Sequence, residues 1–280
     1  MSRSGRVADR RAAVLGSPVA HSLSPRLHRA AYEWLGLSWT YDAIDVATAE
    51  LPQFLAALGP EWVGLSLTMP LKEAVLSLLD EVEPAALLTR AVNTVVVESG
   101  RLLGFNTDID GLVDVLRRHD VRAGSSSVVL GGGATARSAV AALARVGVGP
   151  VTALVRNPAA GDELVALGAD LGVDVAARDW LPDGRALGGI LAAAEVVVST
   201  VPPGGADPLA AHLLVGRTTT SLLVDVVYDP WPTPLARAWQ RAGGNVAGGR
   251  ELLVGQAVEQ VRLMTGEPVP TDVLWAALTD

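Results

Sequence analysis

The fold of this 280-residue chain follows from one stretch, Ser127-Val128-Val129-Leu130-Gly131-Gly132-Gly133-Ala134-Thr135-Ala136. Its first four residues predict a buried strand, and the glycines after them predict a tight turn into an alanine-rich helix over 134–146. In this G-x-G-x-x-A pattern the first glycine permits the turn, the second lets the backbone approach a pyrophosphate, and the small Ala136 lets helix and strand pack closely. The helix start attracts phosphate groups. The stretch therefore predicts a dinucleotide-binding βαβ unit.

Strands and helices alternate on both sides of this stretch. Runs of β-branched residues predict strands at 12–15, 39–44, 62–67, 92–97, 127–130, 151–155, 196–201 and 221–227. Helical spacing of apolar residues predicts helices at 25–36, 49–58, 71–79, 110–118, 134–146 and 162–171. The alternation is typical of an α/β fold with largely parallel sheets.

A boundary near residues 107–124 divides the chain into two expected domains. Residues 1–109 predict an N-terminal α/β substrate domain, and 251–280 are expected to pack back on it. Residues 110–250 predict a Rossmann-type domain, a doubly wound parallel sheet. We expect a cleft between the two domains.

The composition excludes several classes of protein. A net charge of −8 and an aromatic content of 4% argue against a nucleic-acid surface. With no cysteine, the chain has no disulfide, thiolate metal site or cysteine nucleophile, which fits a cytoplasmic protein. The apolar run 186–201 contains Glu195 and is too short for a membrane span. No signal peptide is visible. The expected ligands are small molecules.

Histidine and carboxylate positions give no metal or nucleophile pattern. Asp108 and Asp110 form a carboxylate pair, but the four histidines are scattered along the sequence. No two of them are four residues apart, as a pair of metal ligands on a helix would be, so no metal is expected. His21 is adjacent in sequence to Ser22, which is a poor placement for a base and its nucleophile.

Arg156 indicates which dinucleotide the chain prefers. It follows the expected strand 151–155, where the adenosine ribose lies in such folds, and no carboxylate occurs before Asp162. An acidic residue there would bind a ribose hydroxyl, whereas an arginine suits a 2′-phosphate. The position favours NADP, and the alternative is an arginine merely exposed at a strand end.

Lys72 is the only lysine in the chain, beside 21 arginines. Arginine stays protonated at any physiological pH, whereas a partly buried lysine can release and regain a proton. The alternative is an ordinary surface lysine in an arginine-rich composition. Its position after Met69-Pro70, at the start of an apolar helical run, favours a chemical role.

Four polar clusters occur in the first 110 residues, each at a strand end or a helix start. Ser22 and Ser24 precede or begin a helix, so they either cap it or hold a carboxylate. The other clusters are 66–72 with Thr68 and Lys72, 91–94 with Asn93, and 104–108 with Asp108. Asn and Thr in loops are often only turn formers. The order of the four clusters along the chain favours ligand binding over a role only in turns and caps.

The series S-x-S-P (22–25), T-x-P-x-K (68–72), A-x-N-T (91–94) and N-T-D (106–108), ahead of G-x-G-x-x-A, closely resembles the shikimate dehydrogenase family. The motif Y-x-P-x-x-T-P-L at 228–235 also matches, and L-L-V-G-Q at 252–256 is similar to the family's M-L-x-x-Q. The resemblance covers about residues 12–265.

This resemblance implies reversible, NADPH-dependent reduction of 3-dehydroshikimate to shikimate, in the chorismate pathway to aromatic amino acids. Lys72 and Asp108 match the family's catalytic pair, and we expect the Asp108 carboxylate to orient the ammonium group. The substrate-binding positions are matched by Ser22, Ser24, Thr68, Asn93, Tyr228 and Gln256. The cofactor-binding positions are matched by Gly131, Gly132, Gly133, Ala134, Thr135, Arg156, Val226 and Gly249.

The chain departs from the family pattern at a few positions. Ser66 stands where the family usually has asparagine, although serine can still donate a hydrogen bond. Ala160 replaces a frequent second arginine, which weakens the NADP assignment without reversing it. Glu251 and Leu252 replace glycine and methionine.

Two alternatives to this function stay open at this point. One is a related dehydrogenase that acts on quinate or an aminoshikimate with NAD or NADP. The other is a non-catalytic, NADP-responsive regulator, against which the intact Lys72 and Asp108 speak. The chain is expected to be a monomer or a homodimer.

Overall fold

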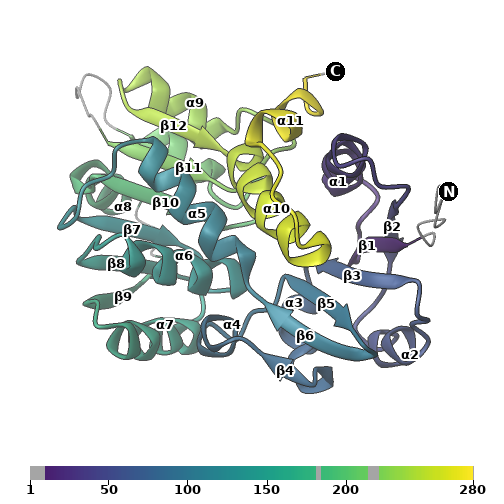
Figure 1. Cartoon of the computed structure of the whole chain (residues 1–280). Helices are drawn as coiled ribbons and strands as arrows, with labels where there is room; N and C mark the ends of the chain where they lie inside the picture. The colour runs from purple at the N-terminus through teal and green to yellow at the C-terminus, as the bar shows by residue number, and fades with distance from the viewer. Residues whose placement is uncertain (1–9, 181–183, 214–220, 280) are drawn as a thin grey trace, which may run out of the picture. The chain divides into compact units, whose positions relative to one another are not determined.

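The computed structural model describes residues 10–180, 184–213 and 221–279 (Figure 1). The chain divides into two compact units. The first unit is Met1–Thr107 with Val254–Asp280, and the second unit is Asp108–Leu253.

The first unit is built on one six-stranded sheet. Its strands are β1 (Arg11–Gly16), β2 (Thr40–Asp45), β3 (Trp62–Leu67), β4 (Glu81–Val82), β5 (Thr94–Glu98) and β6 (Arg101–Phe105). Their order in the sheet is β2-β1-β3-β5-β6-β4. β1, β2 and β3 are parallel, as predicted, whereas β5 pairs antiparallel with both β3 and β6. The sheet is therefore mixed, because a β5–β6 hairpin that the sequence pattern did not predict is inserted into it.

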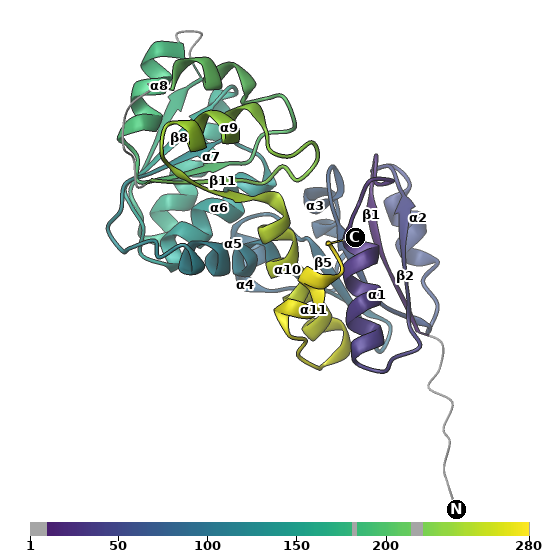
Figure 2. The ribbon, with the colours of Figure 1, turned by 90° about the horizontal axis from the view of Figure 1, so that it is seen from above.

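Helices cover both faces of this sheet. They are α1 (Ser24–Trp34), α2 (Leu51–Ala56), α3 (Leu71–Ala74), the 3₁₀ helix η1 (Leu76–Leu78), α4 (Pro84–Leu88), α11 (Thr271–Ala276) and the part of α10 (Gly249–Thr265) that begins at Val254. Alternate residues of β1 point to opposite faces, as the pleat requires. Ala12 and Val14 pack in a cluster with Tyr32 of α1 and Met264 of α10, while Leu15 packs with Leu51 of α2 in another. In Figure 2, α10 and α11 lie beside α1.

The second unit contains a sheet that is parallel throughout its described strands. Its strands are β7 (Ser127–Leu130), β8 (Val151–Val155), β9 (Val175–Asp179), β10 (Val196–Ser199), β11 (Leu222–Asp225) and β12 (Asn245–Gly248). The sheet order is β12-β11-β10-β7-β8-β9, and all pairs are parallel. Counted along the chain, this is the doubly wound order 6-5-4-1-2-3 of a Rossmann-type sheet, with its switch point between β7 and β10.

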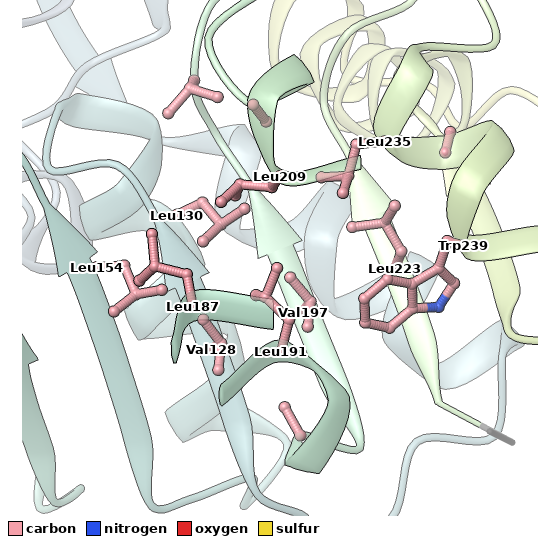
Figure 3. Close-up of a cluster of buried hydrophobic side chains, with 14 residues drawn as sticks. Val128, Leu130, Leu154, Leu187, Leu191, Val197, Leu209, Leu223, Leu235 and Trp239 are labelled. Carbon is pink, nitrogen blue, oxygen red and sulfur yellow. The ribbon is translucent and has the colours of Figure 1, made fainter. Parts of the chain in front are cut away.

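In the second unit one helix precedes the first strand and the others follow strands. They are α5 (Thr107–Arg118), α6 (Ala134–Arg145), α7 (Pro158–Leu171), α8 (Gly184–Ala193), the 3₁₀ helix η2 (Asp207–His212) and α9 (Pro234–Arg241). Figure 3 shows α8, η2 and α9 packed on one face of the sheet. Leu191, Leu209 and Trp239 from these helices meet Val197 and Leu223 from the strands, and all five side chains are almost fully buried.

Two predicted helices differ from the observed ones. The run 71–79 is not one helix but α3 followed by η1. The helix predicted from 162 begins at Pro158, because Asn157 caps it by accepting a hydrogen bond from Ala159 N at 3.1 Å and proline suits the first turn. In the part of the chain that the structure describes, no helix is long and apolar enough to cross a membrane.

Candidate active site

The four polar clusters of the first unit lie along one edge of its sheet. β1 and β3 are parallel, so both end at this edge. β5 is antiparallel to β3 and begins there, and β6 is antiparallel to β5 and ends there. The topology therefore gathers segments that are separated by up to about 80 residues in the sequence.

Gly16 ends β1 at a point where two of these segments touch. A Cβ on Gly16 would lie 2.3 Å from Thr68 Cγ2, so the close approach requires glycine. Thr68 N donates to Leu15 O at 2.9 Å, and Ser17 N donates to Met69 O at 3.1 Å. These bonds hold the loop after β1 against the loop after β3.

Ser22 and Ser24 lie at the start of α1, but neither occupies the N-cap position. That position is Leu23, and Ser24 is already helical. Ser22 Oγ accepts a hydrogen bond from Ser24 N at 3.3 Å. Of the two interpretations left open, capping therefore does not apply to Ser24, while Ser22 satisfies one amide of the first turn.

Lys72 is half-buried in the short helix α3. Its neighbour Leu71 is fully buried and anchors the helix to the core. The Lys72 carbonyl oxygen accepts a hydrogen bond from Val92 N at 2.9 Å, so the backbone that carries Lys72 is joined to the backbone next to Asn93.

Asn93 lies just before β5 at the centre of a buried polar cluster. Its Oδ1 accepts from Thr107 N at 2.8 Å and from Thr94 Oγ1 at 2.8 Å. Its Nδ2 donates to Thr107 Oγ1 at 3.0 Å and to Gln256 Oε1 at 3.5 Å. Asn93 thus connects the start of β5 with Thr107, after β6, and with α10. It lies beside Gln256, which is predicted to bind the substrate.

Asp108 follows Thr107 directly and is the second residue of α5. Its side chain is buried. A carboxylate in the first turn of a helix is favoured by the helix dipole. Asp110, the other member of the carboxylate pair, contacts Arg145 at 2.6 Å, so its charge is used in an ion pair within the second unit.

The glycine turn of the second unit separates strand β7 from helix α6. Gly131 has φ +112°, and a Cβ there would lie 2.6 Å from Thr200 Oγ1, so this position requires glycine. A Cβ on Gly133, in contrast, would meet no described atom within 4 Å. Gly133 thus faces open space at the N-terminus of a 12-residue helix that begins at Ala134 and Thr135, which suits a pyrophosphate.

Arg156 is exposed and directly follows β8. Gly132 packs against α7, because a Cβ there would lie 2.7 Å from Ala160 Cβ. The residue that replaces the family's frequent second arginine is therefore a packing contact of the glycine turn.

Val226 and Gly249 meet after β11, and Tyr228 lies in the same loop. A Cβ on Gly249 would lie 2.2 Å from the Val226 carbonyl oxygen, and Gly249 N donates to Val227 O at 3.2 Å. Burial, and to a smaller extent the charge of Asp229, raises the pKa of the Tyr228 hydroxyl, so Tyr228 keeps its proton and can donate to a carboxylate.

Asp225 organises this loop, and the motifs did not point to it. Its Oδ1 accepts from Val227 N at 3.2 Å, and its Oδ2 accepts from Thr233 Oγ1 at 2.8 Å. Burial raises the pKa of the Asp225 carboxyl, and these two hydrogen bonds oppose that rise.

Gln260, Tyr41 and His28 were also missed. They form buried polar contacts next to Asn93. The one available signal was a pair of glutamines four residues apart, at 256 and 260, which a helix places on one face.

Comparisons with known proteins agree over nearly the whole chain. Residues 14–95 match the model of the shikimate dehydrogenase substrate binding domain, and 249–279 match that of the shikimate 5′-dehydrogenase C-terminal domain. The shikimate dehydrogenase (NADP(+)) of Citrifermentans bemidjiense is 40% identical over an alignment of 282 positions, which covers 95% of this chain and 93% of that protein.

Solved structures give the same picture. Mycobacterium tuberculosis shikimate dehydrogenase is 44% identical, with a TM-score of 0.86 over 96% of this chain and 98% of that one. Thermus thermophilus shikimate 5-dehydrogenase, solved in complex with NADP(H) and shikimate, is 35% identical, with a TM-score of 0.81 over 96% and 98% of the two chains.

Proposed function

The chain belongs to the shikimate dehydrogenase family, and from this premise we propose how its residues interconvert shikimate and 3-dehydroshikimate. It is an NADP-dependent oxidoreductase that acts on a CH–OH group. The observation that best supports the proposed residue roles is the edge of the first unit's sheet. There the chain's only lysine shares linked loops with a buried asparagine and with serines at a helix start.

The substrate is held by hydroxyl and amide groups rather than by a buried cation. We assign its carboxylate to Ser22, Ser24, Thr68 and Tyr228, and its hydroxyls to Asn93 and Gln256. The protonated Tyr228 hydroxyl and the hydroxyl groups of Ser22, Ser24 and Thr68 supply donors for an anion. Asn93 is restrained by several hydrogen bonds, which keeps its amide in one orientation.

Lys72 acts as the general acid and base. During reduction, negative charge develops on the carbonyl oxygen of 3-dehydroshikimate, and the Lys72 ammonium stabilises it and donates a proton. During oxidation of shikimate, the neutral amine accepts that proton. Asp108 orients the ammonium group. Proton transfer of this kind typically contributes about 10²–10⁴-fold to the rate.

The residues of the second unit fit an NADP molecule. NADPH, when bound, supplies the hydride that reduces the carbonyl carbon. The turn Gly131–Thr135 holds the pyrophosphate against the start of α6, where the space in front of Gly133 is open. Arg156 pairs with the 2′-phosphate. Val226 and Gly249, whose backbones touch, form the nicotinamide end.

The two parts of the chain are proposed to bind different ligands. We assign substrate binding to residues 1–109 with 251–280, and NADP binding to 110–250. The enzyme works on small molecules in the cytoplasm, as a monomer or homodimer, without nucleic acid or membrane, in the chorismate pathway to aromatic amino acids. A net charge of −8 supports the absence of nucleic acid.

A turnover assay tests this function. Purified protein is mixed with NADP⁺ and either shikimate or quinate, and NADPH formation is followed by its absorbance. We expect NADPH with shikimate and far less with quinate. Turnover with quinate alone would replace the substrate assignment, and no turnover with either would favour a non-catalytic regulator.

A further inference from the structure

Gln260 is buried at the centre of the first unit, one helical turn after Gln256 on α10, with only 1% of its surface exposed. A side-chain amide offers two donor hydrogens and an acceptor oxygen with two lone pairs. All four are used here. Nε2 donates to Thr94 Oγ1 at 3.0 Å and to Asn93 O at 3.3 Å. Oε1 contacts Ser66 Oγ at 2.9 Å and His28 Nε2 at 3.1 Å.

The Asn93 carbonyl fixes the orientation of this amide. A carbonyl oxygen can only accept, so the NH₂ group of Gln260 must face Asn93 and its oxygen must face Ser66 and His28. His28 therefore donates from Nε2. Burial lowers the pKa of His28 to about 4, so the imidazole is neutral near pH 7 and carries this single proton.

The orientation of the Gln260 amide also determines which hydroxyl groups donate and which accept in the hydrogen bonds of Ser66 and Tyr41. Ser66 donates its one proton to Gln260, so it must accept from Tyr41, whose hydroxyl lies 2.6 Å away. Tyr41 has then used its proton, and Ser24 of α1 lies close enough to lower the pKa of its hydroxyl, against the larger opposite effect of burial.

His28 ties the same helix to the network a second time. It lies one turn after Ser24 on α1, and its ring stacks on Tyr41 with a centroid distance of 4.0 Å and an interplanar angle of 15°. Gln260 thus reaches α1 through His28 and through Ser66 and Tyr41, while it contacts the Asn93 backbone directly. A single amide links three of the segments that carry proposed substrate ligands.

We propose that Gln260 is a positioning residue for the substrate, which sets the places of Asn93, Ser24 and Gln256 without touching the ligand. The proposal rests on the substrate roles given above. It also explains the unusual Ser66: its hydroxyl donates inward to Gln260, so it belongs to the supporting network and does not replace the family's asparagine as a donor to substrate.

The test replaces Gln260 with methionine, which is close in size but has no hydrogen-bonding amide. We expect the KM for shikimate to rise about tenfold or more in Gln260→Met, the equivalent of losing one or two net hydrogen bonds. The KM for NADP⁺ should stay within about twofold, because the network lies in the first unit. Met264→Leu is the matched control: it alters a buried residue one turn further along α10. It should leave both KM values near wild type.

Ser66→Ala tests the positioning role of Gln260 if Gln260→Met does not fold. It removes one oxygen and cuts the row between Tyr41 and Gln260, and we expect a several-fold rise in the KM for shikimate with that for NADP⁺ unchanged. A folded Gln260→Met, or Ser66→Ala, with a shikimate KM within about twofold of wild type would overturn the proposal, as would an equal rise in both KM values. Failure of the proposed function is recognised separately, because wild type would then not reduce NADP⁺ with shikimate.

Discussion

At the scale of the residue, two glycines of one turn serve different purposes. Gly131 is required by its own backbone, which is left-handed, and by the contact with Thr200. Gly133 has an extended backbone, φ −87° and ψ −170°, that any residue can adopt, and a side chain there would have space. The fold thus accounts for Gly131, whereas for Gly133 we propose that the bound dinucleotide is the reason.

Alanine substitution separates these two roles. We expect Gly133→Ala to weaken NADP⁺ binding about tenfold or more while it costs at most about 1 kcal/mol of stability, the difference between glycine and alanine at an N-cap. Gly131→Ala should lower the free energy of unfolding by about 1–3 kcal/mol. Titration calorimetry and urea unfolding measure the two effects. Normal NADP⁺ affinity in Gly133→Ala would place the pyrophosphate elsewhere.

Arg156 gives a second prediction at this scale. We expect Arg156→Ala to raise the KM for NADP⁺ about tenfold or more, because an ion pair with the 2′-phosphate is lost, and to leave the KM for NAD⁺ nearly unchanged. Arg101→Ala, which removes an exposed arginine of the first unit, is the control for the change in net charge. Equal weakening of both cofactors would contradict the role of Arg156.

Sequence patterns found the residues that lie inside motifs and missed those that join motifs. Lys72 and Asn93 stand in short, ordered strings that survive as local signals. Gln260 was missed because its partners are far away in sequence: Ser66 is 194 residues distant and His28 is 232. Such contacts depend on strand order and helix packing, and no local pattern contains them.

At the scale of the element, Thr233 and Asp225 join a strand to a helix. Thr233 Oγ1 caps α9 by accepting from Ala236 N at 3.1 Å and donates to Asp225 at the end of β11. The loop between them carries Tyr228 and begins beside Val226. Its conformation therefore depends on one buried hydroxyl and one buried carboxylate.

Thr233→Val tests this connection. The change keeps the shape of the side chain, and we expect it to reduce the free energy of unfolding by about 2 kcal/mol or more through loss of the cap and of a bond to a carboxylate. Thr233→Ser keeps the hydroxyl and should lose at most about 1 kcal/mol. Equilibrium unfolding in urea compares them, and equal losses in both variants would contradict the role of the hydroxyl.

Elements with one clear period were predicted well, and those defined by tertiary contacts were not. Residues 127–130 form β7 as predicted, because a short apolar run before glycines permits few other structures. The strands β4, β6, β9 and β12 were missed. β6 is only partly buried, and it contains Gly104. A Cβ on Gly104 would lie 2.5 Å from Leu79 Cδ1, so packing rather than strand propensity explains the sequence of β6.

At the scale of the whole molecule, the chain passes between its two units twice, after Thr107 and after Leu253. The second passage lies within α10, so Gly249 and Gln256, proposed to serve the cofactor and the substrate, are on one helix. Asp108 follows the first passage directly. Asp108, Gly249 and Gln256 therefore lie close in sequence to the points where the chain passes from one unit to the other.

His28 makes the stability of the chain depend on pH. Its pKa is lowered by burial from 6.5 to about 4, although the hydrogen bond to Gln260 opposes the shift. Between these values the unfolded chain binds a proton that the folded chain does not, so His28 lowers stability progressively as pH falls through this window. The full difference is on the order of 3 kcal/mol.

His28→Gln is predicted to remove this dependence while a donor to Gln260 is retained. The free energy of unfolding of wild type, relative to that of the variant, should fall by about 3 kcal/mol between pH 7 and pH 4. His212→Gln, at an exposed histidine, should show no comparable change relative to wild type. Urea unfolding at several pH values provides the measurement, and a constant difference between wild type and His28→Gln would contradict the buried, neutral histidine.

Lys72 is proposed to transfer the proton, and steady-state kinetics of Lys72→Arg with shikimate and NADP⁺ examine this role without intermediary. Arginine retains the positive charge but cannot release a proton at physiological pH. We predict that kcat falls by about 10²–10⁴-fold while the KM values for shikimate and NADP⁺ change little. A variant whose kcat stays close to that of wild type would contradict the account.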